Sequence, residues 1–176
     1  LCSGNYGWLR AYVEHYCNEL EKAGKFMLYI WPYHCQLGKI GHGVVGVIQE
    51  AIAFHAFTRG SAPHFEVKGG SFYTENYSVL SPEVLTTHTG QSIGQRNTDF
   101  IKKLLDTDYL IIDGQAWTHC VNFSIDDLLK GMDPKLTQKV YILGDCMSAV
   151  AVPDGKGGFL ADFTAAGVSI GGAHGC

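Results

Sequence analysis

The sequence predicts an α/β protein in which a mostly parallel sheet is flanked by helices on both faces. Short apolar runs, which are typical of buried strands, alternate along the chain with amphipathic segments of helical length. This alternation favours strand–helix–strand units, which build parallel sheets. The length of 176 residues suits a single domain, and a hydrophobic content of 46% is enough for a sizeable core.

The first part of the chain contains two expected helices and two expected strands. Residues 8–23 place apolar side chains at helical spacing, which predicts an amphipathic helix. Residues 26–31 form a continuous apolar run ended by a proline, which predicts a strand buried on both faces. A second, mostly buried helix is expected over 44–57, and a short strand over 64–68 is ended by a pair of glycines.

The rest of the chain begins with residues 70–95, which are rich in Ser, Thr, Gly and Tyr and predict a long surface loop. A loop of that length inside a compact domain is usually functional. Helices and strands then alternate again. We expect helices over 97–105 and 120–129, and strands over 109–112, 140–143 and 168–170.

Charge and composition exclude several classes of protein. Acidic residues outnumber Lys and Arg by 17 to 13, and the net charge of −4 argues against a protein that grips nucleic-acid phosphates. No apolar run approaches the roughly 18 residues of a membrane span, and the first residues resemble no signal peptide. The six cysteines are widely spaced, without a CxxC pair, which indicates reduced thiols and a cytoplasmic protein.

The segment 113–121 is the most informative for chemistry, because it places Cys120 in the first turn of a helix beyond a buried strand. The N–H groups and positive end of that helix stabilise a thiolate, and small residues ahead of it allow N–H groups to face an oxyanion. Cys120 is therefore either a nucleophile or a thiol packed under the helix start. Cys146, which also follows a strand, is the second candidate. His119 is a poor base for Cys120, because adjacent helical side chains point about 100° apart.

Two further segments follow expected strands, at the edge where parallel sheets carry their active sites. Lys68 ends one strand, and an ammonium group near a thiol favours the thiolate, although most such lysines are merely solvated. Trp31 ends the other strand, where an aromatic side chain could line a pocket. His34 is either a metal ligand or a structural histidine, since no other histidine has a recognised ligand spacing to it.

Four blocks of sequence occur together in a specific order. They are Trp31-Pro32-Tyr33-His34-Cys35, Phe65-Glu66-Val67-Lys68-Gly69, Thr74-Glu75-Asn76-Tyr77-Ser78-Val79-Leu80, and Gly114-Gln115-Ala116 running into His119-Cys120-Val121. In this order they resemble the isochorismatase-like cysteine hydrolase superfamily, to which nicotinamidases belong. The resemblance extends from about residue 8 to residue 153.

The resemblance implies a Rossmann-like three-layer sandwich with an Asp–Lys–Cys triad. Cys120 would be the nucleophile and Lys68 the triad lysine. A cis peptide bond would join Gln115 to Ala116 and would aim the N–H of Ala116, together with that of Cys120, at the oxyanion.

The same resemblance implies the residues that meet the substrate or a metal. Trp31 matches the aromatic residue that lines the nicotinamidase pocket, and Trp117 is also expected to contact substrate. His34 matches one of the metal-binding histidines of nicotinamidases.

The sequence also departs from the family pattern. The family carries the triad aspartate on a first, central strand, and nothing before Trp8 resembles that strand. The remaining nicotinamidase metal ligands would lie in the same region. Residues 162–168 run a helix start directly into the last strand. We therefore expect one domain over 1–176 that is incomplete at the N-terminus and near 155–167, because a parallel sheet without its central strand would expose two long edges.

The resulting hypothesis is a cysteine-dependent hydrolase that cleaves a C–N bond in an amide, ureido or carbamoyl group of a small molecule. It would work through a thioester and without a cofactor. A metal-dependent nicotinamidase, with His34 as a ligand of zinc or iron, is the first alternative. A catalytically inactive member that binds a ligand or partner is the second. Family members are commonly oligomers, so a homo-oligomer is expected, with neither nucleic acid nor membrane as a partner.

Overall fold

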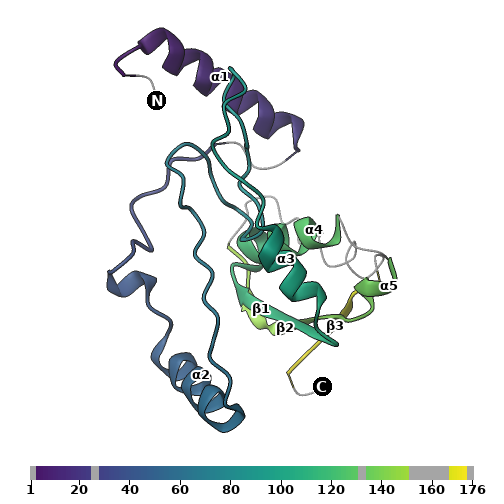
Figure 1. Ribbon diagram of the computed structural model, residues 1–176. Coiled ribbons are helices and arrows are strands. Elements are labelled where there is room, and N and C mark those ends of the chain that lie inside the picture. The colour runs from purple at the N-terminus through teal and green to yellow at the C-terminus, as the bar shows by residue number, and fades with distance from the viewer. Residues whose placement is uncertain (1–2, 25–27, 131–133, 151–166, 174–176) are drawn as a thin grey trace. The chain divides into compact units, whose positions relative to one another are not determined.

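The computed structural model describes residues 3–24, 28–130, 134–150 and 167–173. The chain divides into two compact units, whose elements are drawn in Figure 1. The first unit consists of Leu1–Tyr16 together with Lys68–Cys176, and the second unit is Cys17–Val67. The single-domain organisation stays a prediction, and the expected gap near 155–167 lies almost wholly outside the described residues.

A parallel sheet forms the centre of the first unit (Figure 1). Its three strands lie in the order β1-β2-β3. They are β1 (Leu110–Gln115), β2 (Val140–Ser148) and β3 (Ser169–Gly171). Ile112 is in register with Ile142, which in turn is in register with Ile170. The predicted α/β class, with a parallel sheet and flanking helices, is therefore confirmed.

The core of the first unit lies on one face of this sheet. Helix α4 (Asn122–Leu129) covers that face, and Ile125, Val140 and Ile142 are each 0% exposed. Side chains of β1 alternate between half-buried and exposed, as expected for a strand with one covered face. On the opposite face Ile111 is 57% exposed.

The remaining helices of the first unit occur close to their predicted positions. Helix α3 (Thr98–Leu105) begins after Asn97, whose side chain caps the helix by accepting the N–H of Phe100 at 3.1 Å. Helix α1 (Tyr6–Lys22) buries Tyr12 and Tyr16, four residues apart on one face. The short helix α5 (Pro134–Thr137) precedes β2.

The second unit contains the end of α1, a 3₁₀ turn η1 (Ile40–His42) and helix α2 (Gly46–Arg59). Helix α2 lies where the sequence predicts it and ends at Gly60, whose φ of 60° is the left-handed conformation that glycine adopts readily. The expectation that this helix is mostly buried is wrong, because no residue of α2 is buried. The apolar composition of α2 is typical of a buried helix, but composition alone does not establish that other parts of the chain cover it.

Two predicted strands are not formed. Residues 28–31 and 64–68 have no regular secondary structure, and Ile30 and Phe65 are 89% and 59% exposed. Residues 26 and 27 of the first predicted strand lie outside the described residues. Apolar composition predicts a buried strand, but a strand also requires a neighbouring backbone for its hydrogen bonds. The described residues of the second unit include no strand that could supply one.

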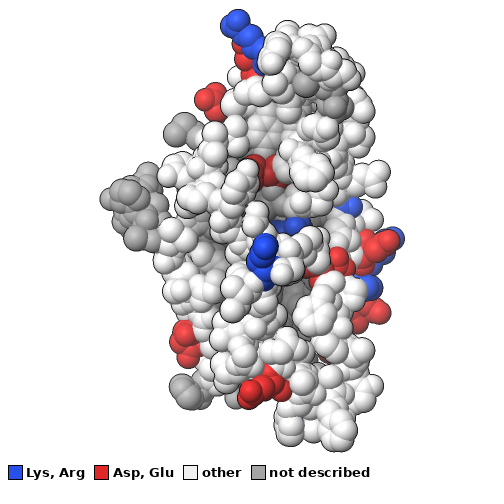
Figure 2. All heavy atoms as spheres, turned by 90° about the vertical axis from the view of Figure 1, so that its left-hand side faces the viewer, with Lys and Arg blue, Asp and Glu red and all other residues white. Residues whose placement is uncertain are grey.

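Charged side chains are scattered over the surface. On the face drawn in Figure 2, Lys and Arg lie singly or in small groups beside Asp and Glu. Of the helices that the structure describes, none is both long and apolar enough to span a membrane.

Candidate active site

Cys120 lies where β1 leads into α4. Strand β1 ends at Gln115, and a cis peptide bond joins Gln115 to Ala116, at the position that the resemblance implies. Residues Trp117–Val121 then form one π-helical turn, η2, before α4 begins. The sequence predicted a helix from Cys120 onward, and the structure begins it three residues earlier with this wider turn.

The turn is closed by a single carbonyl group. The oxygen of Ala116 accepts the N–H groups of His119 at 3.0 Å and of Val121 at 3.2 Å. The bond to Val121 spans five residues, which defines the π-turn, and such turns are frequent at functional sites. Cys120 is half-buried between these two donors, and Trp117 is half-buried in the same turn.

Lys68 approaches the Cys120 thiol directly. Its Nζ lies 3.0 Å from Cys120 Sγ, although the two residues are 52 positions apart. The same ammonium group donates to the carbonyl oxygens of Asn76 at 2.9 Å and Tyr77 at 3.0 Å. An ammonium group has three N–H donors, so these three acceptors orient it fully. A cation at this distance can balance negative charge that develops on the sulfur.

The end of β2 braces the segment that precedes Cys120. Gln115 Oε1 accepts both the N–H of Ser148 at 3.2 Å and its hydroxyl at 2.7 Å. The N–H of Val150 donates to Thr118 Oγ1 at 3.2 Å, and Thr118 is buried. These bonds hold the segment from Gln115 to Thr118 against the end of β2.

Two residues of the site were missed by sequence reasoning. Ser124 Oγ donates to the carbonyl oxygen of Cys120 at 2.7 Å and accepts the N–H of Val79 at 3.1 Å. It therefore ties the long loop to the turn that carries the thiol, and its spacing of four from Cys120 was an available signal. Glu83 accepts the N–H of Tyr77 at 3.1 Å, and a single glutamate in a loop gives no comparable signal.

A cavity of about 400 Å³ opens beside Cys120. Its walls include all of β1, together with apolar side chains of α3, α4 and the long loop. In the described part of the chain β1 pairs with β2 alone, so its other edge is free to line this cavity. Apart from Cys120, the polar side chains in the lining are Asp113, Gln115 and Ser124.

His119 and Cys146 are less suited to catalysis than Cys120. Burial lowers the pKa of His119, whose Nδ1 lies 2.8 Å from Thr118 Oγ1. Desolvation and the carboxylates of Asp145 and Asp113 raise the pKa of the Cys146 thiol, which disfavours its thiolate. Cys146 Sγ lies 3.6 Å from Asp145 Oδ1.

Trp31 and His34 belong to the second unit, Cys17–Val67. Trp31 is 52% exposed, with its ring 4.5 Å from that of Tyr29 and 6.4 Å from that of His34. His34 Nδ1 is 2.7 Å from the carbonyl oxygen of Pro32. The described residues bring together no group of three His, Cys, Asp or Glu side chains. Of the metal ligands that the resemblance implies, these residues include His34 alone.

Comparison with solved structures identifies the fold. No protein-family model matches the sequence, and no curated protein matches it. The yeast nicotinamidase bound to the inhibitor nicotinaldehyde superposes with a TM-score of 0.56 and 18% identity, over 84% of this chain and 60% of that protein. The zinc complex of the Pyrococcus horikoshii pyrazinamidase gives a TM-score of 0.51 and 19% identity, over 91% of this chain and 82% of that protein.

These structures define a class of fold. The chain has the isochorismatase-like fold of nicotinamidases and pyrazinamidases. It spans 60% of the length of the yeast nicotinamidase, so the activity of the whole protein is a matter for proposal.

Proposed function

We propose that Cys120 is the nucleophile of a hydrolase that cleaves a C–N bond in an amide, ureido or carbamoyl group of a small molecule. The observation that carries this proposal is the distance of 3.0 Å between Lys68 Nζ and Cys120 Sγ, in the turn that follows a parallel strand. Carboxyl ends of parallel strands are where α/β proteins bind their ligands. The nicotinamidases and pyrazinamidases that share the fold are, by name, enzymes that act on small amides.

The reaction follows from the chemistry of a thiolate. Cys120 Sγ attacks the carbonyl carbon, and the N–H groups of Ala116 and Cys120 hold the oxyanion that forms. The C–N bond then breaks, the nitrogen leaves as ammonia or an amine with one added proton, and a thioester remains. Water hydrolyses the thioester, which releases the acid and returns the thiol. Lys68 stabilises the negative sulfur before attack and after release.

The proton of the Cys120 thiol requires an acceptor. The resemblance implies that an aspartate on a central strand takes this proton. A strand that paired with the free edge of β1 would line the cavity beside Cys120, and we assign the implied aspartate to that edge.

The test is release of ammonia from small primary amides, with nicotinamide and pyrazinamide first in the series. Cys120→Ala should reduce turnover to below about a thousandth of the wild type, because it removes the nucleophile. Cys146→Ala serves as the matched control and should retain turnover, and circular dichroism should show both variants folded. Turnover that survives in Cys120→Ala would exclude the mechanism. Binding of amides without turnover by the wild type would favour the inactive binding module.

A metal-dependent nicotinamidase is the second candidate, because the Pyrococcus horikoshii pyrazinamidase was solved in complex with zinc. In that case His34 would be one ligand, and the chelated protein would lose activity and regain it with zinc or iron. Full activity of a metal-free preparation would exclude this candidate. The cytoplasmic location and the homo-oligomeric state remain predictions of the sequence.

A further inference from the structure

We infer that Glu83 is a positioning residue that orients Lys68 toward Cys120 by holding the peptide group between Asn76 and Tyr77. The inference rests on the proposed function, because it concerns the pair formed by Lys68 and Cys120. It assigns a role to a side chain that acts on Lys68 through the main chain of the loop.

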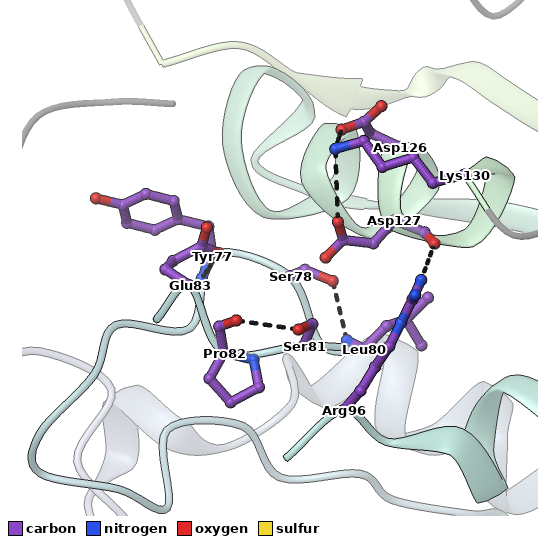
Figure 3. Close-up of polar contacts among 10 residues, drawn as sticks. All are labelled: Tyr77, Ser78, Leu80, Ser81, Pro82, Glu83, Arg96, Asp126, Asp127 and Lys130. Carbon is purple, nitrogen blue, oxygen red and sulfur yellow. Dashed lines mark hydrogen bonds and ion pairs between the residues drawn. The ribbon is translucent and has the colours of Figure 1, made fainter. Parts of the chain in front are cut away.

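Glu83 closes the loop that carries the two carbonyl acceptors of Lys68. Its main-chain N–H donates to the carbonyl oxygen of Glu75 at 2.9 Å, and its Oε1 accepts the N–H of Tyr77 at 3.1 Å. Figure 3 shows Tyr77 and Glu83 next to one another on this loop. Main chain and side chain of one residue therefore fasten both ends of the short segment from Glu75 to Tyr77.

The peptide group between Asn76 and Tyr77 is held from both sides. Its carbonyl oxygen accepts from Lys68 Nζ at 2.9 Å, and its N–H donates to Glu83 at 3.1 Å. A peptide group is planar, so a partner that fixes the direction of the N–H also fixes the direction of the carbonyl. A carboxylate on the N–H also polarises the group and makes the carbonyl a stronger acceptor for the ammonium.

The orientation of this peptide group determines how Lys68 meets the thiol. Lys68 is an exposed residue on a flexible stem, so its head group is fixed by its acceptors and not by packing. With the oxygens of Asn76 and Tyr77 in place, its remaining N–H points to Cys120 Sγ at 3.0 Å. If the peptide group turns, Lys68 spends less time near the sulfur and the thiolate loses its cation.

The negative charge of Glu83 would by itself disfavour a nearby thiolate, which is the opposite of the effect of its positioning role. The hydrogen bond that Lys130 donates to Asp126 is the largest cause that raises the pKa of Lys130, and the carboxylates of Asp127 and Glu83 raise it further. Glu83 is therefore close enough to Lys130 for its carboxylate to act on that ammonium group. Removal of that charge alone would favour a nearby thiolate. Loss of positioning would disfavour it, so the two roles predict opposite changes.

The experiment measures the alkylation of Cys120 by iodoacetamide in the full chain, as the ratio of the rates at pH 6.5 and pH 9.5. Glu83→Ala should lower this ratio roughly threefold to tenfold, as expected for the loss of one hydrogen bond. Glu83→Gln keeps an oxygen acceptor for the Tyr77 N–H without the charge and should stay within about twofold of the wild type. Glu75→Ala, the matched control, removes a carboxylate from the same loop and should not lower the ratio.

A second pair of variants tests the route through Lys68. In a Lys68→Ala background, Glu83→Ala should produce no further decrease, because the group that it positions is gone. If circular dichroism shows that Glu83→Ala is unfolded, Glu83→Asp replaces it and should give the same decrease, because the shorter side chain keeps the charge but loses the reach.

An unchanged or increased ratio in Glu83→Ala would overturn the inference, as would an undiminished effect in the Lys68→Ala background. Alkylation requires no substrate, so these outcomes are independent of turnover. Amide hydrolysis that survives in Cys120→Ala would instead overturn the proposed function alone.

Discussion

Cys120 lies just after one strand of the parallel sheet and Cys146 lies near the end of another, yet the charged groups beside the two thiols have opposite signs. Cys120 faces the Lys68 ammonium at 3.0 Å, whereas Cys146 faces the Asp145 carboxylate at 3.6 Å. Iodoacetamide at pH 6.5 should therefore modify Cys120 before Cys17, Cys35 and Cys146, which can be followed by peptide mass spectrometry. Among the thiols that the structure describes, Cys35 and Cys146 are exposed and Cys120 is half-buried. An order that simply follows exposure would contradict this expectation.

His119 offers a test of pH dependence at the residue scale. Burial lowers its pKa in the folded protein, whereas the unfolded chain binds the proton near pH 6.5. Above that pH both states are neutral at this group. As the pH falls below 6.5, the unfolded state gains a proton that the folded state does not, and the free energy of unfolding decreases.

We therefore expect the Tm of the wild type to fall more between pH 7.5 and pH 5.5 than the Tm of His119→Gln. Thermal unfolding followed by circular dichroism measures both, and the other histidines contribute equally to each. Equal slopes would show that His119 titrates in the same way in the folded and unfolded states.

At the scale of single residues, the sequence predicted those candidates whose residue type and spacing indicate a chemical role. Cys120 and Lys68 were named as candidates, and the structure brings them together, while their catalytic roles stay predictions. Ser124 and Glu83 were missed because both accept main-chain N–H groups of the long loop, those of Val79 and Tyr77. No local pattern records where an irregular loop places its N–H and carbonyl groups.

At the scale of elements, Tyr12 and Tyr16 of α1 hold the long loop that carries the acceptors of Lys68. The N–H of Glu75 donates to the hydroxyl of Tyr16 at 2.8 Å, and the hydroxyl of Tyr12 donates to the carbonyl oxygen of Tyr73. Burial is the main cause that raises the pKa of Tyr16 to about 12. Its hydroxyl therefore stays neutral throughout the physiological range and serves as a constant anchor for the loop.

Tyr16→Phe should lower the free energy of unfolding by about 1 kcal/mol, because it leaves the Glu75 N–H without this acceptor. Tyr6→Phe on the same helix is the matched control, since Tyr6 is 82% exposed, and it should change stability by less than about 0.5 kcal/mol. Urea denaturation measures both variants. A similar cost for the two substitutions would argue against the role of Tyr16 as an anchor.

The predicted elements succeeded where local periodicity determines the outcome. Amphipathic spacing predicted α1, α3 and α4, and apolar runs predicted the positions of β1, β2 and β3. The predicted strands were wrong over 28–31 and 64–68, because an apolar run does not reveal whether another strand lies beside it. The π-turn before α4 was also missed, since one extra residue in a helical turn leaves no signature in the spacing of apolar residues.

On the scale of the whole molecule, the described residues that are buried against the sheet lie on one of its sides. Ile125 and Ile142 are fully buried between α4 and the strands, while Ile111 and Tyr109 on the other side are 57% and 70% exposed. The α/β class was predictable because alternation of element types determines it. Which face of the sheet is covered was not predictable, because this depends on how segments that are distant in the sequence pack against it.

This asymmetry leads to an expectation for two isoleucines of the same sheet. Ile142→Ala removes a side chain that is 0% exposed and should cost about 2–4 kcal/mol, since it leaves a cavity in the core. Ile111→Ala truncates a side chain that is 57% exposed and should cost at most about 1 kcal/mol. Urea unfolding of both variants, with equal m-values as the check for a common unfolded state, compares them directly. Equal costs would mean that the side of β1 that carries Ile111 is covered in the folded protein. A large cost for Ile142 alone would confirm that the face under α4 carries the stability of this sheet.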